Sequence, residues 1–335
     1  MSKCKYTSIG GQALNEGIMM KSPEKTALAV RLPDGNIDIS PMEYTSVRTK
    51  YKILNMPIVR GVVGFVESMV QGYKAMMISA DKSGFTDLEE ENDKKGDKEK
   101  SKESQALLSV IMVIGTVLGV ASSVVLFMYL PRLFVDGLKW LFKTDFSAVV
   151  RSSIEQLLKL SIFVAYMLAV SYMKDIKRVF MYHGAEHKTI FCYEKGLELT
   201  VENVRKQSRF HPRCGTSFMI LMILISIIFS TIVQMIFPNV YNIKWLWVVA
   251  KILLIPIICG VGFEVLKFCG KYDNIFTKII SAPGLWMQRI STKEPEDCMI
   301  EIAIAALRAC EPENPDVDRE IDKKPNTKDT ENDDI

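Results

Sequence analysis

Two long segments of this chain contain no charged residue, and they constrain the fold more than any other feature of the sequence. They are Ala106–Leu130 and Phe218–Phe237. A helix needs roughly 20 apolar residues to cross about 30 Å of hydrocarbon, so each segment is long enough to span a bilayer. Leu157–Met173 and Trp245–Phe268 are also apolar but carry a few ionisable side chains, such as Lys159, which are tolerated where they reach the interface. The sequence therefore predicts four membrane-spanning helices.

The remaining sequence is far more polar and divides into regions of different character. Apolar residues make up 48% of the chain and charged residues 24%, a combination typical of apolar blocks joined by polar segments. The predicted regions are an N-terminal cytoplasmic segment with β structure (1–55), an amphipathic or interfacial helix (56–80), a disordered charged linker (81–104), a transmembrane region (105–270) with a cytoplasmic loop (174–217), a cytoplasmic C-terminal helical segment (271–310) and a disordered tail (311–335). In the first region, the turn residues 33–36 between two β-prone runs predict a hairpin. The expected fold class is mainly α: a polytopic helical membrane protein with a small N-terminal β-hairpin.

Basic residues collect on one side of the predicted spans. Nine lysines and arginines lie between Lys174 and Arg213, whereas the connection Pro238–Lys244 has only Lys244. Since positively charged loops stay in the cytoplasm, we expect both termini to be cytoplasmic, in a multi-pass protein of the cytoplasmic membrane whose main partner is the lipid bilayer. The seven cysteines have no regular spacing, which favours free thiols in a reducing compartment, and the net charge of +3 gives no reason to expect nucleic-acid binding.

All three histidines of the chain lie between residues 183 and 211. If the span that begins at Leu157 continues into the cytoplasm as one helix, His183 and His187 lie one turn apart on the same face. Glu186 lies between them in an H-x-x-E-H pattern, the reverse of the zinc-hydrolase helix, in which the glutamate acts as a base on water at the metal. His211 precedes the next span, and the intervening loop can fold back toward the first pair.

These residues predict a transition-metal site at the membrane surface. The expected ligands are His183, His187, His211 and Cys214, with Glu186 as the catalytic base, and a donor set of imidazole and thiolate favours zinc or another transition metal. Four protein ligands would make a closed structural site, whereas three would leave a position open for chemistry. A simpler interpretation takes Glu186 as an exposed helix residue and Cys214 as an ordinary reduced thiol.

Two functions follow from the predicted site. The first is a metal-dependent hydrolase that acts at the cytoplasmic face of the membrane. The second is a non-catalytic assembly or accessory factor, in which the metal holds a surface rigid for a membrane-protein partner. The number of protein ligands distinguishes them.

Three separated motifs carry a resemblance to a known family. They are GGQALNEGIMMKSP at Gly10–Pro23, the segment His183–Phe218 that begins HGAEHK, and APGLWMQRISTKEPEDCMIEIAIAAL at Ala282–Leu307. In these motifs, and over most of the chain apart from the linker and tail, the sequence resembles the YqhQ-like bacterial membrane protein family. The resemblance implies a multi-pass membrane protein of unknown function, a family that is sometimes labelled a predicted metal-dependent enzyme.

The first and last motifs also permit predictions from their residues. In the first, we expect a turn leading into a strand, with Glu16 as an alternative further metal ligand. In the last, Pro283 and Gly284 predict a break in the helix. The apolar residues that follow form a helical stripe, which should pack against the cytoplasmic domain. They are Met299, Ile300, Ala303, Ile304 and Leu307.

Overall fold

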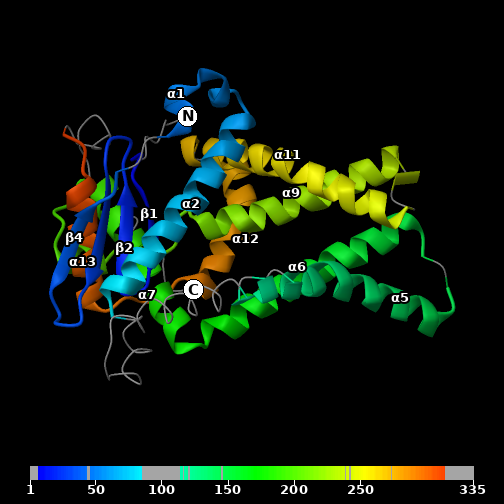
Figure 1. Cartoon of the computed structure of the whole chain (residues 1–335), viewed down its shortest axis with the longest axis horizontal. Coiled ribbons are helices and arrows are strands. Elements are labelled where there is room, and N and C mark those ends of the chain that lie inside the picture. The colour runs from blue at the N-terminus through cyan, green and yellow to red at the C-terminus, as the bar shows by residue number, and fades with distance from the viewer. Residues whose placement is uncertain are drawn as a thin grey trace, which may run out of the picture.

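The structure is a computed structural model that describes residues 7–43, 46–84 and 114–313, except for 116, 120, 145, 238, 241, 242 and 273. Figure 1 shows a small β-sheet with helices on both faces at one end, and long helices that extend away from it. Most of the predicted linker (81–104) and tail (311–335) lies outside the described residues.

The sheet is antiparallel, with its strands in sequence order. The strands are β1 (Gly10–Leu14), β2 (Gly17–Lys21), β3 (Thr26–Arg31) and β4 (Ile37–Pro41). β3 and β4 form the predicted hairpin, in which Gly35 adopts the left-handed conformation (φ 88°) that glycine takes without strain. The first motif forms a second hairpin through a turn at Glu16, so the sheet is twice as large as expected, and β1 is one of its edges.

Helices cover both faces of the sheet. On one face, Ile18 and Met20 pack with residues of α7 (Lys174–Glu194) and α13 (Asp297–Cys310) in the main hydrophobic core. On the other, Met19 and Leu28 pack with Ala75 of α2 (Val59–Lys82). The predicted apolar stripe of the last motif is buried in the main core as α13. Because burying each large apolar side chain contributes about 1.5–3 kcal/mol, this two-sided cover stabilises the small sheet.

Among the described residues, four helices are long and apolar enough to cross a membrane. The candidate spans are Val117–Phe142, which includes η3 (Val125–Tyr129) and α5 (Leu130–Phe142); Val150–Ser171 within α6 (Ala148–Ser171); Gly215–Ile236, which is α9; and Leu246–Gly270 within α11 (Lys244–Lys271). Four spans were predicted. Residues 106–113 of the first, Ala106–Leu130, lie outside the described residues, and its described part continues to Phe142, while α6 begins before Leu157. α6 starts at the N-cap Ser147, whose side chain accepts a hydrogen bond from the Val150 backbone. Arg151, within this first part of α6, bonds Asp136 of α5 at 2.7 Å and Glu155 at 3.2 Å.

Two helices run crosswise to the spans, α2 and α12 (Ile275–Ser291), as Figure 1 shows. Arg60 at the start of α2 bonds Glu264 of α11, and the buried Glu67 accepts hydrogen bonds from Ser46 and the Val47 backbone. Three short helices complete the described structure: α1 (Val47–Lys50), η1 (Lys52–Asn55) and α8 (Val201–Arg205).

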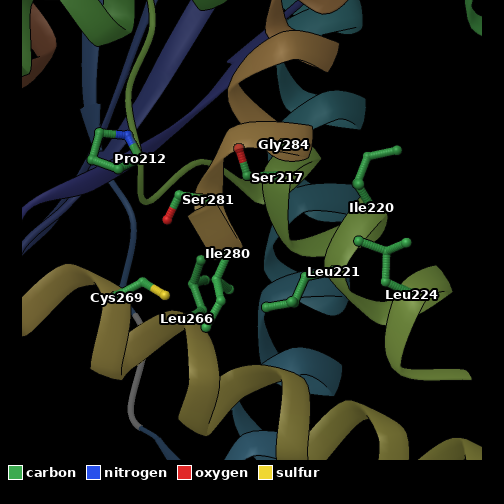
Figure 2. A pocket seen from close by; sticks show the side chains of 10 residues that line it. All are labelled: Pro212, Ser217, Ile220, Leu221, Leu224, Leu266, Cys269, Ile280, Ser281 and Gly284. Carbon is green, nitrogen blue, oxygen red and sulfur yellow. The ribbon is translucent and has the colours of Figure 1, made fainter. Parts of the chain in front are cut away.

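One assumption and one prediction about helix continuity were wrong. The helix that begins before Leu157 does not continue through the histidines, because Met173 is extended (ψ 133°) and separates α6 from α7. The change of direction lets α7 pack against α13 and the sheet. Pro283 does not break its helix either: α12 runs through it, and Gly284 lets the helix approach Ser217 of α9. Figure 2 shows Ser217 beside Gly284, next to a cavity of only about 10 Å³.

Candidate metal centre

Three of the predicted ligands come together where the helix bundle meets the sheet domain. His183 and His187 lie one turn apart on α7, with ring centroids 4.4 Å apart. Cys214 is the N-cap residue of α9, and its Sγ accepts a hydrogen bond from the Thr216 backbone at 3.4 Å. The ligand atoms of the three residues all lie within 4.8 Å of one another, and His183 Nε2 is 3.0 Å from Cys214 Sγ. We call His183, His187 and Cys214 the His–Cys group.

Backbone carbonyls orient both imidazoles of the group. His183 Nδ1 donates to the carbonyl oxygen of Ser291, the last residue of α12, at 2.9 Å. His187 Nδ1 donates to the carbonyl oxygen of Arg209 at 2.6 Å. A carbonyl oxygen can only accept, so both Nδ1 atoms carry the proton and both Nε2 atoms are left for the centre. Metal-binding histidines usually show this arrangement, with one nitrogen held by a carbonyl or carboxylate.

The charges of the group are strongly coupled. Burial opposes the thiolate form of Cys214, but the adjacent His183 and His187 outweigh it and hold the pKa of the thiol well below its usual value. Burial likewise opposes the imidazolium form of His183, but the Cys214 sulfur outweighs it and raises the pKa to about 9. These opposite shifts favour a Cys214 thiolate beside a protonated His183. The thiolate is also the form of cysteine that binds metals.

Glu186 lies beside the group but is not part of it. Its side chain is only 5% exposed, so the interpretation as an exposed helix residue is wrong. The Gly11 backbone bonds the carboxylate, while Oε2 has no hydrogen-bond partner in the described part of the chain. Burial raises the pKa of Glu186, and the neighbouring imidazoles offset this only in part.

His211 is close to the group but engaged elsewhere. Its ring packs on Phe191, with the centroids 4.7 Å apart, and its Nε2 is 3.7 Å from a carboxylate oxygen of Glu194. Nδ1 accepts a hydrogen bond from the Arg213 backbone at 3.4 Å. Burial lowers the pKa of His211 to about 4, so the ring is neutral at physiological pH. The structure thus places three of the four predicted ligands around one point and His211 next to them.

Glu16 lies away from the group. Its carboxylate pairs with Arg178 and accepts a hydrogen bond from the Tyr182 hydroxyl at 3.0 Å. Glu16 therefore joins the first hairpin to α7 and lies outside the group of potential ligands among the described residues.

Several residues that hold the site were not singled out in the sequence. Gln288, fully buried in α12, bonds both backbone groups of His211 at 2.7 and 2.6 Å and the Ser217 hydroxyl at 2.8 Å. A glutamine among the apolar residues of α12 is the sequence feature that could have indicated this buried role. Gly184, which weakens the helix in isolation, admits the backbone of Lys293 where any side chain would collide with it. Nothing in the local sequence indicates that contact.

The fold and the site define a class: a multi-pass helical membrane protein with a buried histidine–cysteine group where its bundle meets a small β-containing domain. The family described as "Protein of unknown function (DUF1385)" matches residues 56–313. "Uncharacterized protein YqhQ" of Bacillus subtilis (strain 168) is 36% identical over 309 residues, which cover 92% of this chain and 93% of that protein. The chain therefore belongs to this YqhQ-like family of unknown function, as its motifs predicted. No solved structure matches it.

Proposed function

We propose that this protein is a metal-dependent hydrolase of the cytoplasmic membrane, with zinc or a similar transition metal held by His183, His187 and Cys214. The observation that carries the proposal is the convergence of three ligand atoms within 4.8 Å. Three protein ligands are typical of catalytic zinc sites, in which the remaining position is open to water or substrate. His211 does not fill that position, since it is held by Glu194 and Arg213.

The chemistry of the donor set fits such a metal. Two imidazole nitrogens and one thiolate suit zinc, and in a tetrahedral zinc site nitrogen and sulfur ligands lie roughly 3.6 Å apart. His183 Nε2 and Cys214 Sγ, 3.0 Å apart, need to separate only slightly to reach that spacing. When bound, the metal would supply Lewis acidity and a water molecule of lowered pKa.

In this proposal, Glu186 transfers the proton from the attacking water to the leaving group. It directly precedes His187 on α7, and the Gly11 backbone fixes its carboxylate. Its buried, unpartnered Oε2 can take a proton from the attacking water and pass it to the leaving group. A buried carboxylate oxygen without a partner is costly, so its retention beside the group supports a role in chemistry.

Metal analysis of the purified protein in detergent tests the ligand set. His183→Ala, His187→Ala and Cys214→Ser should each lose the metal found in the wild type. His211→Gln and Cys269→Ser are matched controls, a histidine and a buried thiol outside the group, and should retain it. Equal metal content in all variants would refute the site, and loss in His211→Gln would refute the three-ligand geometry.

Glu186→Gln tests catalysis separately. The variant keeps the size of the side chain, so the metal should stay while hydrolysis of p-nitrophenyl phosphate or p-nitrophenyl acetate falls about 10²–10⁴-fold. Unchanged hydrolysis would refute the proton-transfer role.

A structural role for the metal is the second candidate, and one observation favours it. The two histidines already tie α7 to the end of α12 and to the loop before α9. If the metal only strengthens this junction, its removal lowers thermal stability while Glu186→Gln changes nothing beyond stability. In that case the protein fits an accessory factor that presents a rigid surface to a membrane-protein partner.

We also propose that the sheet domain and both termini face the cytoplasm. The basic segment 174–213 forms α7, α8 and the loop before α9, on the side of the sheet, and Lys244 begins α11 at the other end of the bundle. Single cysteines placed at positions 195 and 244 of a variant whose only other cysteine is the buried Cys214 test this arrangement. An impermeant maleimide added to intact cells should label position 244 only, and the opposite pattern would reverse the orientation.

A further inference from the structure

A second site lies on the opposite face of the sheet from the His–Cys group. A cavity of about 320 Å³ opens between α2 and the first hairpin. Residues that line it include Gly10, Gly11 and Gln12 of β1, Lys21 of β2, and Ser68 and Gln71 of α2. Its volume is within the range of about 300–1,000 Å³ typical of small-molecule sites.

The cavity offers hydrogen-bond donors and a positive charge. Lys21 Nζ donates to Gln71 Oε1 at 2.8 Å, which fixes the orientation of the Gln71 amide. Gln71 is only 3% exposed, yet its Nε2 has no hydrogen-bond partner among the described residues. Such a buried donor requires an explanation, and an acceptor from a bound ligand would provide one.

Two further charged residues, Glu67 and Arg48, act on Lys21. Glu67 is 3.3 Å from Arg48 and accepts hydrogen bonds from Ser46 and Val47. Lys21, Arg48 and Glu67 therefore form a group with one net positive charge. Burial also lowers the pKa of Lys21, which shows that the ammonium group is poorly solvated. An anion next to Lys21 and Gln71 Nε2 would replace the lost solvation of the ammonium group and would give the amide donor an acceptor.

The outer face of α2 indicates where the ligand comes from. Large apolar side chains that are 39–66% exposed form a stripe along this face: Val66, Met69, Val70, Tyr73 and Met77. Ser68 and Gln71 face the sheet instead. A helix with an apolar outer face, running crosswise to the spanning helices, is typical of the membrane interface. In that position, the cavity behind α2 would be at the depth of lipid head groups.

We propose that this cavity binds the phosphate group of a membrane amphiphile through Lys21 and the Gln71 amide. Only Gly11 separates it from the proposed proton carrier: a methyl group there would lie 3.0 Å from Glu186 Cδ. Phosphate-bearing amphiphiles are therefore the substrate class of the proposed hydrolase. That assignment rests on the proposed function, whereas the binding itself does not.

Calorimetric titration of the full-length protein in a non-ionic detergent tests the proposal. The probes are dihexanoyl phosphatidate, dihexanoylglycerol, which lacks the phosphate, and inorganic phosphate, which lacks the chains. Phosphatidate should bind on the order of tenfold more tightly than either of the others. Equal binding of dihexanoylglycerol would refute an anion site, and equal binding of inorganic phosphate would refute the membrane source.

Substitutions in the cavity test whether phosphatidate binds there. Lys21→Gln and Gln71→Glu should each weaken phosphatidate binding on the order of tenfold or more, because hydrogen bonds to charged groups are lost. Gln71→Glu keeps a partner for Lys21, so the fold should be retained. Lys25→Gln and Lys74→Gln, exposed lysines outside the cavity, are the controls and should bind within twofold of the wild type. If the cavity variants bind as the controls do, the site is refuted.

The variant Cys214→Ser distinguishes phosphate binding in the cavity from phosphate binding at the proposed metal. The variant lacks a proposed metal ligand, so binding at the cavity should persist in it. Loss of phosphatidate binding in Cys214→Ser would mean that the phosphate binds the metal and not the cavity. If the wild-type protein holds no metal and still binds phosphatidate, the hydrolase is refuted and the phosphate site stands.

Discussion

The substitution Gly11→Ala should damage the site without touching a proposed ligand. A methyl group at this position would lie 2.8 Å from Met20 Sδ, 2.9 Å from the Met19 carbonyl oxygen and 3.0 Å from Glu186 Cδ. Ordinary carbon contacts are about 3.5–4.0 Å, so something must move by roughly half an ångström or more. Met20 is fully buried and the Met19 oxygen belongs to the backbone, which leaves the Glu186 carboxylate as the group most easily displaced.

Two quantities should change together in Gly11→Ala. Overpacking of this kind costs about 1–3 kcal/mol, which lowers the unfolding temperature in detergent by several degrees. Displacement of a catalytic group by about 1 Å can cost on the order of 100-fold in rate, so kcat should fall while the metal content stays at the wild-type level.

The adjacent glycine is the control for stability. A methyl group at Gly10 would meet nothing within 4 Å, so Gly10→Ala should unfold at the wild-type temperature or slightly above it. The argument fails if Gly11→Ala and Gly10→Ala unfold alike, or if Gly11→Ala keeps its full kcat with its full complement of metal.

Two further predictions concern ion pairs of α7. Lys188 is 6% exposed and its partner Glu294 is 56% exposed, so Glu294→Gln, which strands a buried charge, should lower the unfolding temperature more than Lys188→Met does. An equal or opposite effect in thermal unfolding would contradict the buried position of Lys188. Burial alone would raise the pKa of Glu16, but its bond to Arg178 lowers the pKa below the usual 4.5. The pair's contribution is therefore present above pH 4.5 and lost as the pH falls below it, and Glu16→Gln should lose less stability than the wild type between pH 6 and pH 3.

The fold could be predicted to the extent that its signals are local. Apolar length identifies α9 and α11 closely, because a helix satisfies its own backbone hydrogen bonds in lipid. Span limits were less accurate where charged side chains enter the bundle, since the pairing of Arg151 with Asp136 depends on a contact between helices. The second hairpin was missed as a hairpin because its turn contains Glu16 with φ 50°, a conformation that the sequence does not signal there.

The candidate site was predictable in its composition but not in its geometry. The i, i+4 spacing of His183 and His187 fixes their relation within one helix, so that part needed no tertiary information. His211 is held away from them by Glu194, Arg213 and Gln288. Of these, Gln288 is 77 residues distant from His211 in sequence. Proximity along the chain favoured His211 and Cys214 equally, and only the packing distinguishes them.

The positions of the two proposed sites limit the paths by which a substrate could reach the open metal position. His187, Cys214 and Glu186 are buried, whereas His183 is partly exposed, so the open metal position must be approached from the side of His183. The phosphate cavity lies on the other face of the sheet, and β1 is the edge strand between them. Gly10 and Gly11 carry no side chain, and their backbone is exposed at this edge. An amphiphile held by its phosphate behind α2 could therefore extend around the edge at Gly11 toward Glu186, a path that a larger side chain at either glycine would close.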